Sequence, residues 1–222
     1  IDGGFQKFLE TPAGRRKPAL ASELKALHDF QEDLREALGL ESYYNESLGT
    51  IFDRHNYDRL SGRWIVLAIT IAEVINNKIV LAVSSGPTIS SQASFTFYSF
   101  SIGTPAPADA TSFCDYPGLG VDANAIYTGC NMFSSAGGFR WTSAFVIRKS
   151  SVLAGGPIVV TGFSTIATTS VAGPYAPRGV DNDDPTWTEG YIIGTDPGFL
   201  NRINIRRVST PGGTPTLGAN IT

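Results

Sequence analysis

The sequence has few charged residues, and neither sign of charge dominates. Charged side chains make up 17% of its 222 residues, and 17 Lys and Arg against 20 Asp and Glu leave a formal net charge of −3. The basic surface typical of a nucleic-acid-binding domain is therefore missing. No apolar run approaches the about eighteen residues that a membrane-spanning helix needs, so the sequence predicts no transmembrane segment.

The sequence also lacks a Met at position 1 and a charged-then-apolar leader. We therefore expect a processed product or a fragment of a longer precursor. Hydrophobic residues at 42% and aromatic residues at 11% exclude a disordered chain, because such chains bury too little apolar surface to fold. The composition thus indicates a folded, globular protein.

Cysteine and histidine are scarce, with two of each. No histidine lies near Cys114 and Cys130 in the sequence, and a zinc site would need two more ligands. Two alternatives remain, a pair of buried free thiols and a disulfide that closes a loop of about 15 residues and adds about 3 kcal/mol. Abundant Gly and Pro with little Lys are typical of an exported, loop-rich β protein, so we expect the disulfide and an extracellular or cell-surface location.

The charge density divides the chain into residues 1–50 and residues 51–222. The first segment holds six Lys or Arg and nine Asp or Glu, whereas the remaining 172 positions hold eleven of each. Within the first segment an apolar stripe recurs at spacings of three and four, which predicts a helix over 19–38. Its members are Leu20, Leu24, Leu27, Phe30, Leu34 and Leu38. This stripe packs either on its own domain or on another chain.

From Ile51 onward the pattern changes to short apolar runs rich in β-branched residues, which is typical of strands. Asn76 and Asn77 mark a turn between two of these runs, which together predict a hairpin. The strands that we expect cover 64–72, 79–83, 95–100, 125–133, 143–148, 158–163, 190–195 and 202–208.

An internal repeat of 63 to 64 residues connects these strands. Trp64, Tyr127 and Tyr191 each stand at the start of an expected strand, and a polar turn precedes each of them. Several strands in every 60-odd residues are typical of β-propeller blades, so we expect a mainly β fold that forms a partial β-propeller of about three blades behind the N-terminal helix. The alternative is a β-sandwich.

A closed propeller needs at least about four blades. We therefore expect the missing blades in other chains or in a further stretch of the same precursor. The competing interpretation is an open array whose exposed edges are covered by the N-terminal helix.

Several segments of residues 51–222 resemble parts of large secreted bacterial proteins that carry sialidase-like β-propellers. The segments are Asp58-Arg-Leu-Ser-Gly-Arg-Trp64, Leu81-Ala-Val-Ser84, Tyr98-Ser-Phe100, Asp115-Tyr-Pro-Gly-Leu-Gly-Val-Asp122, Asn131-Met-Phe133, Arg206-Arg-Val-Ser209 and Pro211-Gly-Gly-Thr-Pro215. The resemblance implies export and a propeller, but it implies no activity. Residues 1–50 lie outside it.

No convergent catalytic set is evident in the sequence. A sialidase would need an arginine cluster, for which the candidates are Arg148, Arg178, Arg202, Arg206 and Arg207. It would also carry the Asp-box Ser-x-Asp-x-Gly-x-Thr-Trp, which is absent from the chain. Asp115, Asp122 and Glu189 are candidates for the two carboxylates of a glycoside hydrolase. Turn capping is the commoner use of such acids, so we assign no catalytic residue.

The densest acidic cluster contains Asp181, Asp183 and Asp184. Oxygen ligands at close spacing suit Ca²⁺, which is the one cofactor that the sequence suggests. The EF-hand pattern is not met, because Thr186 and Ile192 occupy its glycine and glutamate positions. A surface turn is the alternative.

These patterns predict a non-catalytic binding or structural module of an exported or surface protein, with no specific ligand-binding residue assigned. Its expected partners are other chains or further blades of the same precursor, with a glycan as an additional candidate. The alternative function is a carbohydrate-active hydrolase whose site other blades complete.

Overall fold

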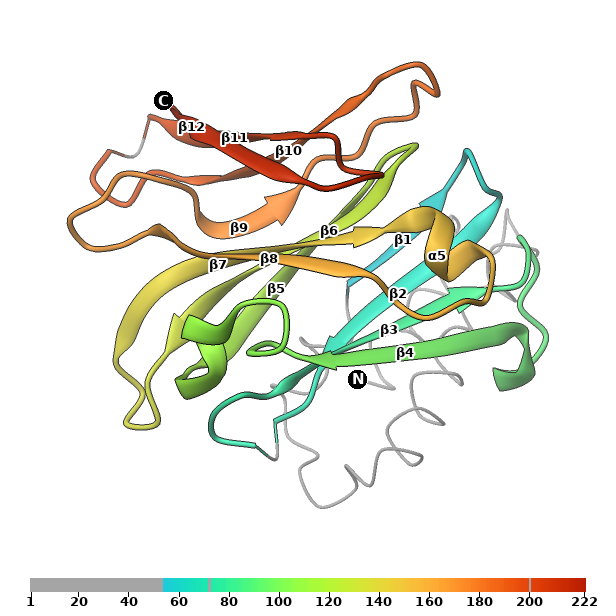
Figure 1. Cartoon of the computed structure of the whole chain (residues 1–222), viewed down its shortest axis with the longest axis horizontal. Helices are drawn as coiled ribbons and strands as arrows, with labels where there is room; N and C mark the ends of the chain where they lie inside the picture. The colour runs from blue at the N-terminus through green and yellow to red at the C-terminus, as the bar shows by residue number, and fades with distance from the viewer. Residues whose placement is uncertain (1–53, 72, 200) are drawn as a thin grey trace, which may run out of the picture.

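The computed structural model describes residues 54–71, 73–199 and 201–222 (Figure 1). This part is mainly β, which confirms the expected fold class. The helix expected over 19–38, and the proposed segment 1–50 to which it belongs, lie outside the described residues.

The twelve strands of the described residues form three four-stranded antiparallel units, which we call meanders 1, 2 and 3. Meander 1 consists of β1 (Arg54–Asp58), β2 (Arg63–Ile69), β3 (Lys78–Ser84) and β4 (Phe95–Ser101). Meander 2 consists of β5 (Phe113–Val121), β6 (Ala125–Phe133), β7 (Phe139–Arg148) and β8 (Val160–Ala167). Meander 3 consists of β9 (Tyr175–Gly179), β10 (Glu189–Thr195), β11 (Ile203–Ser209) and β12 (Thr216–Ile221). The short helices are η2 (Gln92–Ser94), η3 (Pro107–Thr111) and α5 (Lys149–Leu153).

The meanders account for the repeat in the sequence. Each strand pairs with the next strand of its meander. Trp64, Tyr127 and Tyr191 lie near the beginning of β2, β6 and β10, which are the second strands of the three meanders. The recurrence therefore reflects a unit of four strands.

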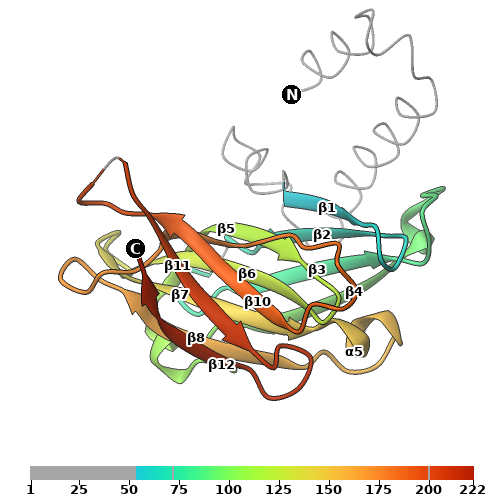
Figure 2. The ribbon, with the colours of Figure 1, turned by 90° about the horizontal axis from the view of Figure 1, so that it is seen from above.

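The meanders stack as three layers, with meander 3 at the top of Figure 1, meander 2 in the middle and meander 1 below; Figure 2 shows them from above. One apolar core lies between meanders 1 and 2 and contains Leu67, Leu81, Ile126 and Phe145. A second core on the other face of meander 2 is formed around Tyr127. Meander 2 is consequently buried on both faces, so residues 125–130 of β6 and 142–147 of β7 are buried without alternation.

Meanders 2 and 3 are not separate blades. Thr128 on β6 pairs with Arg178 on β9, which joins the two meanders into one eight-stranded sheet beside the four-stranded sheet of meander 1. At this crossing a Cβ on Gly120 would lie 2.1 Å from the carbonyl carbon of Gly179, so only glycine permits the close approach of the backbones. The described strands thus form two sheets instead of three independent blades, and a ring with further blades stays a prediction.

The expected disulfide is confirmed. Cys114 on β5 and Cys130 on β6 are bonded, their Cα atoms are 5.3 Å apart, and both residues are buried. Asn77 at the end of the β2–β3 loop binds the same strand, because its side chain accepts a hydrogen bond from Cys114 N (2.8 Å) and donates one to Cys114 O (3.0 Å). The disulfide thus fixes β5 to β6, and the Asn77 side chain fixes β5 to the β2–β3 loop. No helix among the described residues is long and apolar enough to cross a membrane.

Candidate functional site

A small hollow of about 260 Å³ lies where the loop after β9 enters β10. We call it the Trp187 hollow, and its lining consists of Asp122, Val180, Asp181, Asn182, Trp187, Glu189, Gly190 and Tyr191. The loop comes from meander 3 and Asp122 from the β5–β6 turn of meander 2. The hollow is therefore built at the junction of two meanders.

Local hydrogen bonds hold the loop that carries Trp187. The Asn182 side chain accepts a bond from Asp184 N (2.9 Å), and the Asp184 carboxylate accepts bonds from the backbone N–H (2.9 Å) and hydroxyl (2.7 Å) of Thr186. Asn124 anchors the loop to meander 2 by donating to the carbonyl of Trp187 at 2.9 Å. The backbone of Trp187 is thus held while its side chain stays 44% exposed.

Several polar side-chain atoms of the lining residues have no hydrogen-bond partner within the described residues. Among them are the indole Nε1 of Trp187, the hydroxyl of Tyr191 and the Oδ2 atom of Asp181. The other carboxylate oxygen of Asp181 accepts bonds from Val121 N at 2.9 Å and from the Asn56 side chain. The hollow therefore offers a donor, an acceptor and a hydroxyl that can do both.

A buried polar network lies beneath the hollow. Asp122 accepts the hydroxyl proton of Tyr127 on one oxygen and the backbone N–H groups of Asn124 (2.7 Å) and Ala125 (2.8 Å) on the other. Burial, together with the adjacent Asp122 carboxylate, raises the pKa of Tyr127 far above its usual range, so the hydroxyl remains a donor. A Cβ at Gly190 would lie 2.0 Å from that hydroxyl, so the side chain of Tyr127 excludes any larger residue there.

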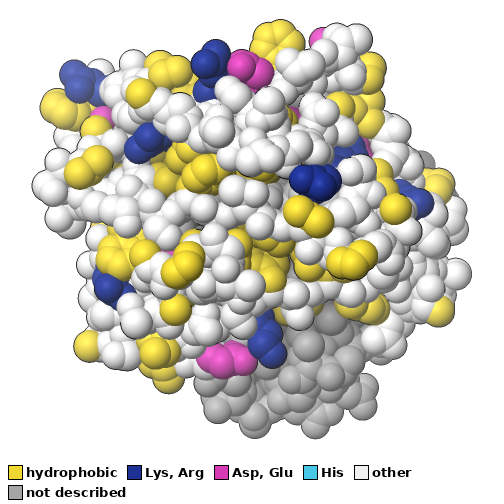
Figure 3. Space-filling model, viewed as in Figure 1, with side chains coloured by type: hydrophobic (Ala, Val, Ile, Leu, Met, Phe, Trp, Pro, Cys, Tyr) yellow, Lys and Arg dark blue, Asp and Glu magenta, His cyan; other side chains and the backbone are white. Residues whose placement is uncertain are grey.

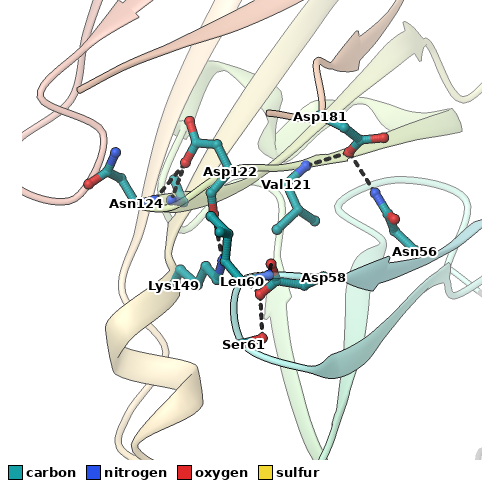
Figure 4. Close-up of polar contacts among 10 residues, drawn as sticks. Asn56, Asp58, Leu60, Ser61, Val121, Asp122, Asn124, Lys149 and Asp181 are labelled. Carbon is teal, nitrogen blue, oxygen red and sulfur yellow. Dashed lines mark hydrogen bonds and ion pairs between the residues drawn. The ribbon is translucent and has the colours of Figure 1, made fainter. Parts of the chain in front are cut away.

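The network continues to meander 1 through Lys149, as Figure 4 shows. Its ammonium lies 2.6 Å from Asp58 Oδ2 and donates to the Asp122 carbonyl at 2.6 Å. Asp58 also accepts bonds from Leu60 N (3.2 Å) and from the hydroxyl of Ser61. The charges of Lys149 and Asp58 thus pair with each other, and their remaining polar atoms bond to the backbone and to the turn after β1. We therefore assign both residues a structural role.

Asp181 lies between two hollows, because it also lines a second one of about 240 Å³ beside Asn56, Tyr57 and Arg59. Burial raises the pKa of Asp181, and the nearby charge of Asp183 raises it further, although the bonds from Val121 and Asn56 and the charge of Arg178 oppose both effects.

The three acids predicted to bind calcium have different partners in the structure. Asp181 bonds Val121 and Asn56, Asp183 lies 3.7 Å from Arg59, and Asp184 caps the loop through Thr186. The Thr186 hydroxyl and N–H lower the pKa of Asp184. Within residues 54–71, 73–199 and 201–222, no group of three or more His, Cys, Asp or Glu is arranged to hold a metal ion. Calcium binding stays a prediction, and the capping geometry is that of the alternative surface turn.

The three candidate carboxylates of a hydrolase do not meet. Asp122 and Glu189 both line the Trp187 hollow, but Asp115 lines a separate hollow of about 470 Å³ with Phe113 and Phe133. Glu189 lies 3.5 Å from the guanidinium of Arg207 and accepts a bond from a serine hydroxyl of β11 at 3.4 Å. Asp122 is buried by the network described above.

The candidate arginines likewise have separate surroundings. Arg148 donates to the Gly213 carbonyl, and Arg206 donates to the carbonyls of Ile166 and Gly218. Arg178 lies on β9 near Asp181, and Arg202 stacks over Phe199. Arg207 pairs with Glu189. This is not the shared arrangement that would bind one substrate carboxylate.

Sequence reasoning did not single out Trp187, and it identified Tyr127 only as a position of the internal repeat. The signal for Trp187 was available, because a large aromatic residue within the polar turn Asp184-Pro-Thr-Trp-Thr has no strand pattern to bury it. Neither a protein-family model, nor a curated protein, nor a solved structure matches this chain. The resemblance to secreted bacterial β-propeller proteins therefore stays a prediction.

Proposed function

We propose that residues 54–222 form a non-catalytic binding module of an exported or surface-exposed protein, with the Trp187 hollow as its ligand site. One observation carries the proposal. The exposed Trp187 stands on a hydrogen-bonded loop beside polar groups that have no partner among the described residues, while the acids around it are engaged in structural contacts. Aromatic platforms with a few convergent polar groups are typical of binding sites.

Export is supported by the buried disulfide, since such bonds persist in oxidising compartments. The surface in Figure 3 carries few and scattered charges, in keeping with the low charged fraction. In native material we expect Cys114 and Cys130 to resist alkylation until a reductant is added. Alkylation of both residues without reduction would contradict export.

Assembly with other chains, or with further units of the same precursor, is supported by an apolar outer face on meander 3. Ile193, Ile205 and Ile221 lie opposite one another on three neighbouring strands, so their side chains share one face. Ile203, two residues from Ile205, shares it as well, and Ile203 and Ile221 are 52% and 55% exposed. Ile221 lies on β12, which is an edge strand of the sheet and contains no charged residue. The charged side chains that often prevent an edge strand from pairing with another chain are therefore missing from β12.

Light scattering tests this assembly. We expect native material larger than the 23.7 kDa monomer, and Ile203→Lys with Ile221→Lys should shift it towards the monomer. A monomer at every concentration, unchanged by the substitutions, would contradict the assembly without affecting the binding site.

A carbohydrate-active hydrolase is the second candidate. It is favoured by the raised pKa of Asp181, because a proton donor of that kind opposite a second carboxylate is the pair that glycoside hydrolysis uses. Glu189 would be the second carboxylate, but it already forms an ion pair with Arg207. Release of reducing sugar from a retained glycan, lost in both Asp181→Asn and Glu189→Gln, would support this candidate. Retention without release supports the binding module.

A further inference from the structure

We propose that the Trp187 hollow binds one neutral sugar ring, with the apolar face of the ring stacked on the Trp187 indole. This inference rests on the proposed binding function and names its ligand class. It follows from the size of the hollow, the chemistry of its lining and the pairing of its charges.

The size of the hollow limits the ligand. Its volume of about 260 Å³ is below the roughly 300–1,000 Å³ typical of pockets for drug-sized ligands. A single six-membered ring fits such a space, and the rest of a longer glycan would extend into solvent past the exposed loop. A peptide segment with several anchoring side chains would need more than one hollow of this size.

The lining combines an aromatic surface with groups that hydrogen-bond to hydroxyls. The indole of Trp187 offers a flat apolar face and an Nε1–H donor, and it gains contact energy from any flat apolar partner. Asp181 Oδ2 is an acceptor, and the Tyr191 hydroxyl serves as donor or acceptor. A pyranose carries C–H groups on its face and hydroxyls around its edge. Its face therefore matches the indole of Trp187, and its hydroxyls match the polar groups of Asp181 and Tyr191.

The charges of the hollow favour a neutral ring over an anionic one. Its lining contains the acids Asp122, Asp181 and Glu189 but no Lys or Arg among the described residues. Arg207 on β11 already pairs with Glu189 at 3.5 Å, and Arg178 on β9 lies near Asp181. A sugar carboxylate would therefore meet acids whose neighbouring cations are already engaged, and like charges at short distance disfavour ligands of the wrong sign.

A cationic ligand is the competing occupant, because a quaternary ammonium binds the face of tryptophan. Glu189 is neutralised by Arg207, and Asp183 by Arg59 at 3.7 Å. Asp181 is the one acid of the lining that is neither buried nor ion-paired within the described residues, and the charge of Arg178 acts on it from β9. Asp181, Asp183 and Glu189 thus each have an arginine nearby, which favours the neutral ring over a cation.

The test is a titration of the full chain with small probes, followed by saturation-transfer NMR and tryptophan fluorescence. The neutral probes are the methyl glycosides of glucose, galactose and mannose; the charged probes are N-acetylneuraminic acid and choline. We expect at least one neutral glycoside to bind and to exceed both charged probes in affinity about tenfold. Trp187→Ala should lower that affinity about tenfold or more, the loss expected when a stacking partner is removed. Phe199→Ala, which removes another aromatic residue that is 52% exposed and does not line the hollow, should leave it unchanged.

The outcomes separate this inference from the proposed function. Binding of N-acetylneuraminic acid or choline that Trp187→Ala abolishes, with no binding of neutral glycosides, would overturn the neutral-sugar inference and leave the binding site in place. Absence of Trp187-dependent binding for every probe would overturn the inference. If Trp187→Ala also leaves retention on arrays of glycans and peptides unchanged, the proposed function fails as well.

Discussion

Lys149 and Asp58 form a buried ion pair, with 2.6 Å between Nζ and Oδ2 and 3% of each side chain exposed. Lys149 belongs to α5, which connects β7 and β8 of meander 2, and Asp58 ends β1 of meander 1, so the pair joins the two sheets. Because the ammonium also donates to the Asp122 carbonyl, the pair connects the sheet junction to the floor of the Trp187 hollow. The position of the proposed site thus depends on an ion pair between meander 2 and meander 1.

Loss of one partner of this pair should be costly. Lys149→Met or Asp58→Asn alone leaves an uncompensated buried group, and we expect each to lower the free energy of unfolding by about 3–5 kcal/mol. Lys149→Met with Asp58→Leu should restore much of that loss, because no charge is then buried. Denaturant unfolding measures all three. Arg59→Ala, which breaks an exposed bridge to Asp183, is the control and should change stability by less than about 1 kcal/mol.

Tyr127 and Gly190 should be strongly coupled. Tyr127→Phe leaves one Asp122 oxygen without its donor, for which we expect a loss of about 1–3 kcal/mol. Gly190→Ala forces a methyl group against the Tyr127 ring and should cost about 1–3 kcal/mol or more. Gly86→Ala is the matched control, since a Cβ there meets no atom within 4 Å. Equal melting temperatures for Gly190→Ala and Gly86→Ala would contradict the packing described here.

Asp109 should make stability fall as the pH rises. It is fully buried and accepts bonds from the Trp141 indole (2.8 Å) and the Ser143 hydroxyl (3.1 Å), while its Oδ2 atom has no partner in the described part of the chain. Burial raises its pKa above 3.8, so the folded state holds the proton more tightly than the unfolded state. The stabilisation from this proton is complete below about pH 3.8 and is lost as the pH rises through the higher folded-state pKa.

Asp109→Asn removes this titration and isolates its effect. The melting temperature of Asp109→Asn minus that of the native chain should increase as the pH is raised from about 4 to 7. Differential scanning fluorimetry at a series of pH values measures this difference. A difference that stays constant across the range would show that Asp109 does not titrate differently in the folded and unfolded states.

The disulfide should contribute to stability. Replacing Cys114 and Cys130 by Ala opens a link between residues 16 positions apart, and we expect a loss of about 3 kcal/mol, measured by thermal unfolding with and without reductant. The native chain should lose stability on reduction, whereas the double variant should not respond. A response to reductant in the variant would show that the effect has another origin.

Apolar periodicity predicted the second and third strands of every meander and the last strands β4 and β8, but it missed the three first strands and β12. β5 contains Pro117 and two glycines, and β9 contains Pro177, so local propensity argues against a strand in both. Both form because β6 and β10 provide hydrogen-bonding edges, which is a tertiary effect. The repeat could be found because it depends on the order of strands along the chain, whereas the joining of meanders 2 and 3 through Thr128 and Arg178 has no local signal.

The candidate site was only partly predictable for the same reason. Asp122 and Glu189 were identified as acids, and the structure places both at one hollow, but their burial and pairing depend on Tyr127 and Arg207 from other strands. Spacing suggested a shared calcium site for the acids at 181–184. Asp181 instead accepts a hydrogen bond from Val121 N, which lies 60 residues away in the sequence. Its role therefore could not be deduced from the spacing of the acids.

The central claim, that the Trp187 hollow binds a ligand without converting it, is tested most directly by glycan retention followed by an assay for new reducing ends. The account predicts that the native chain retains a glycan, that Trp187→Ala loses at least about tenfold of that affinity, and that no reducing ends appear during prolonged incubation. Retention that is indifferent to Trp187, or reducing ends that disappear in Asp181→Asn, would contradict it.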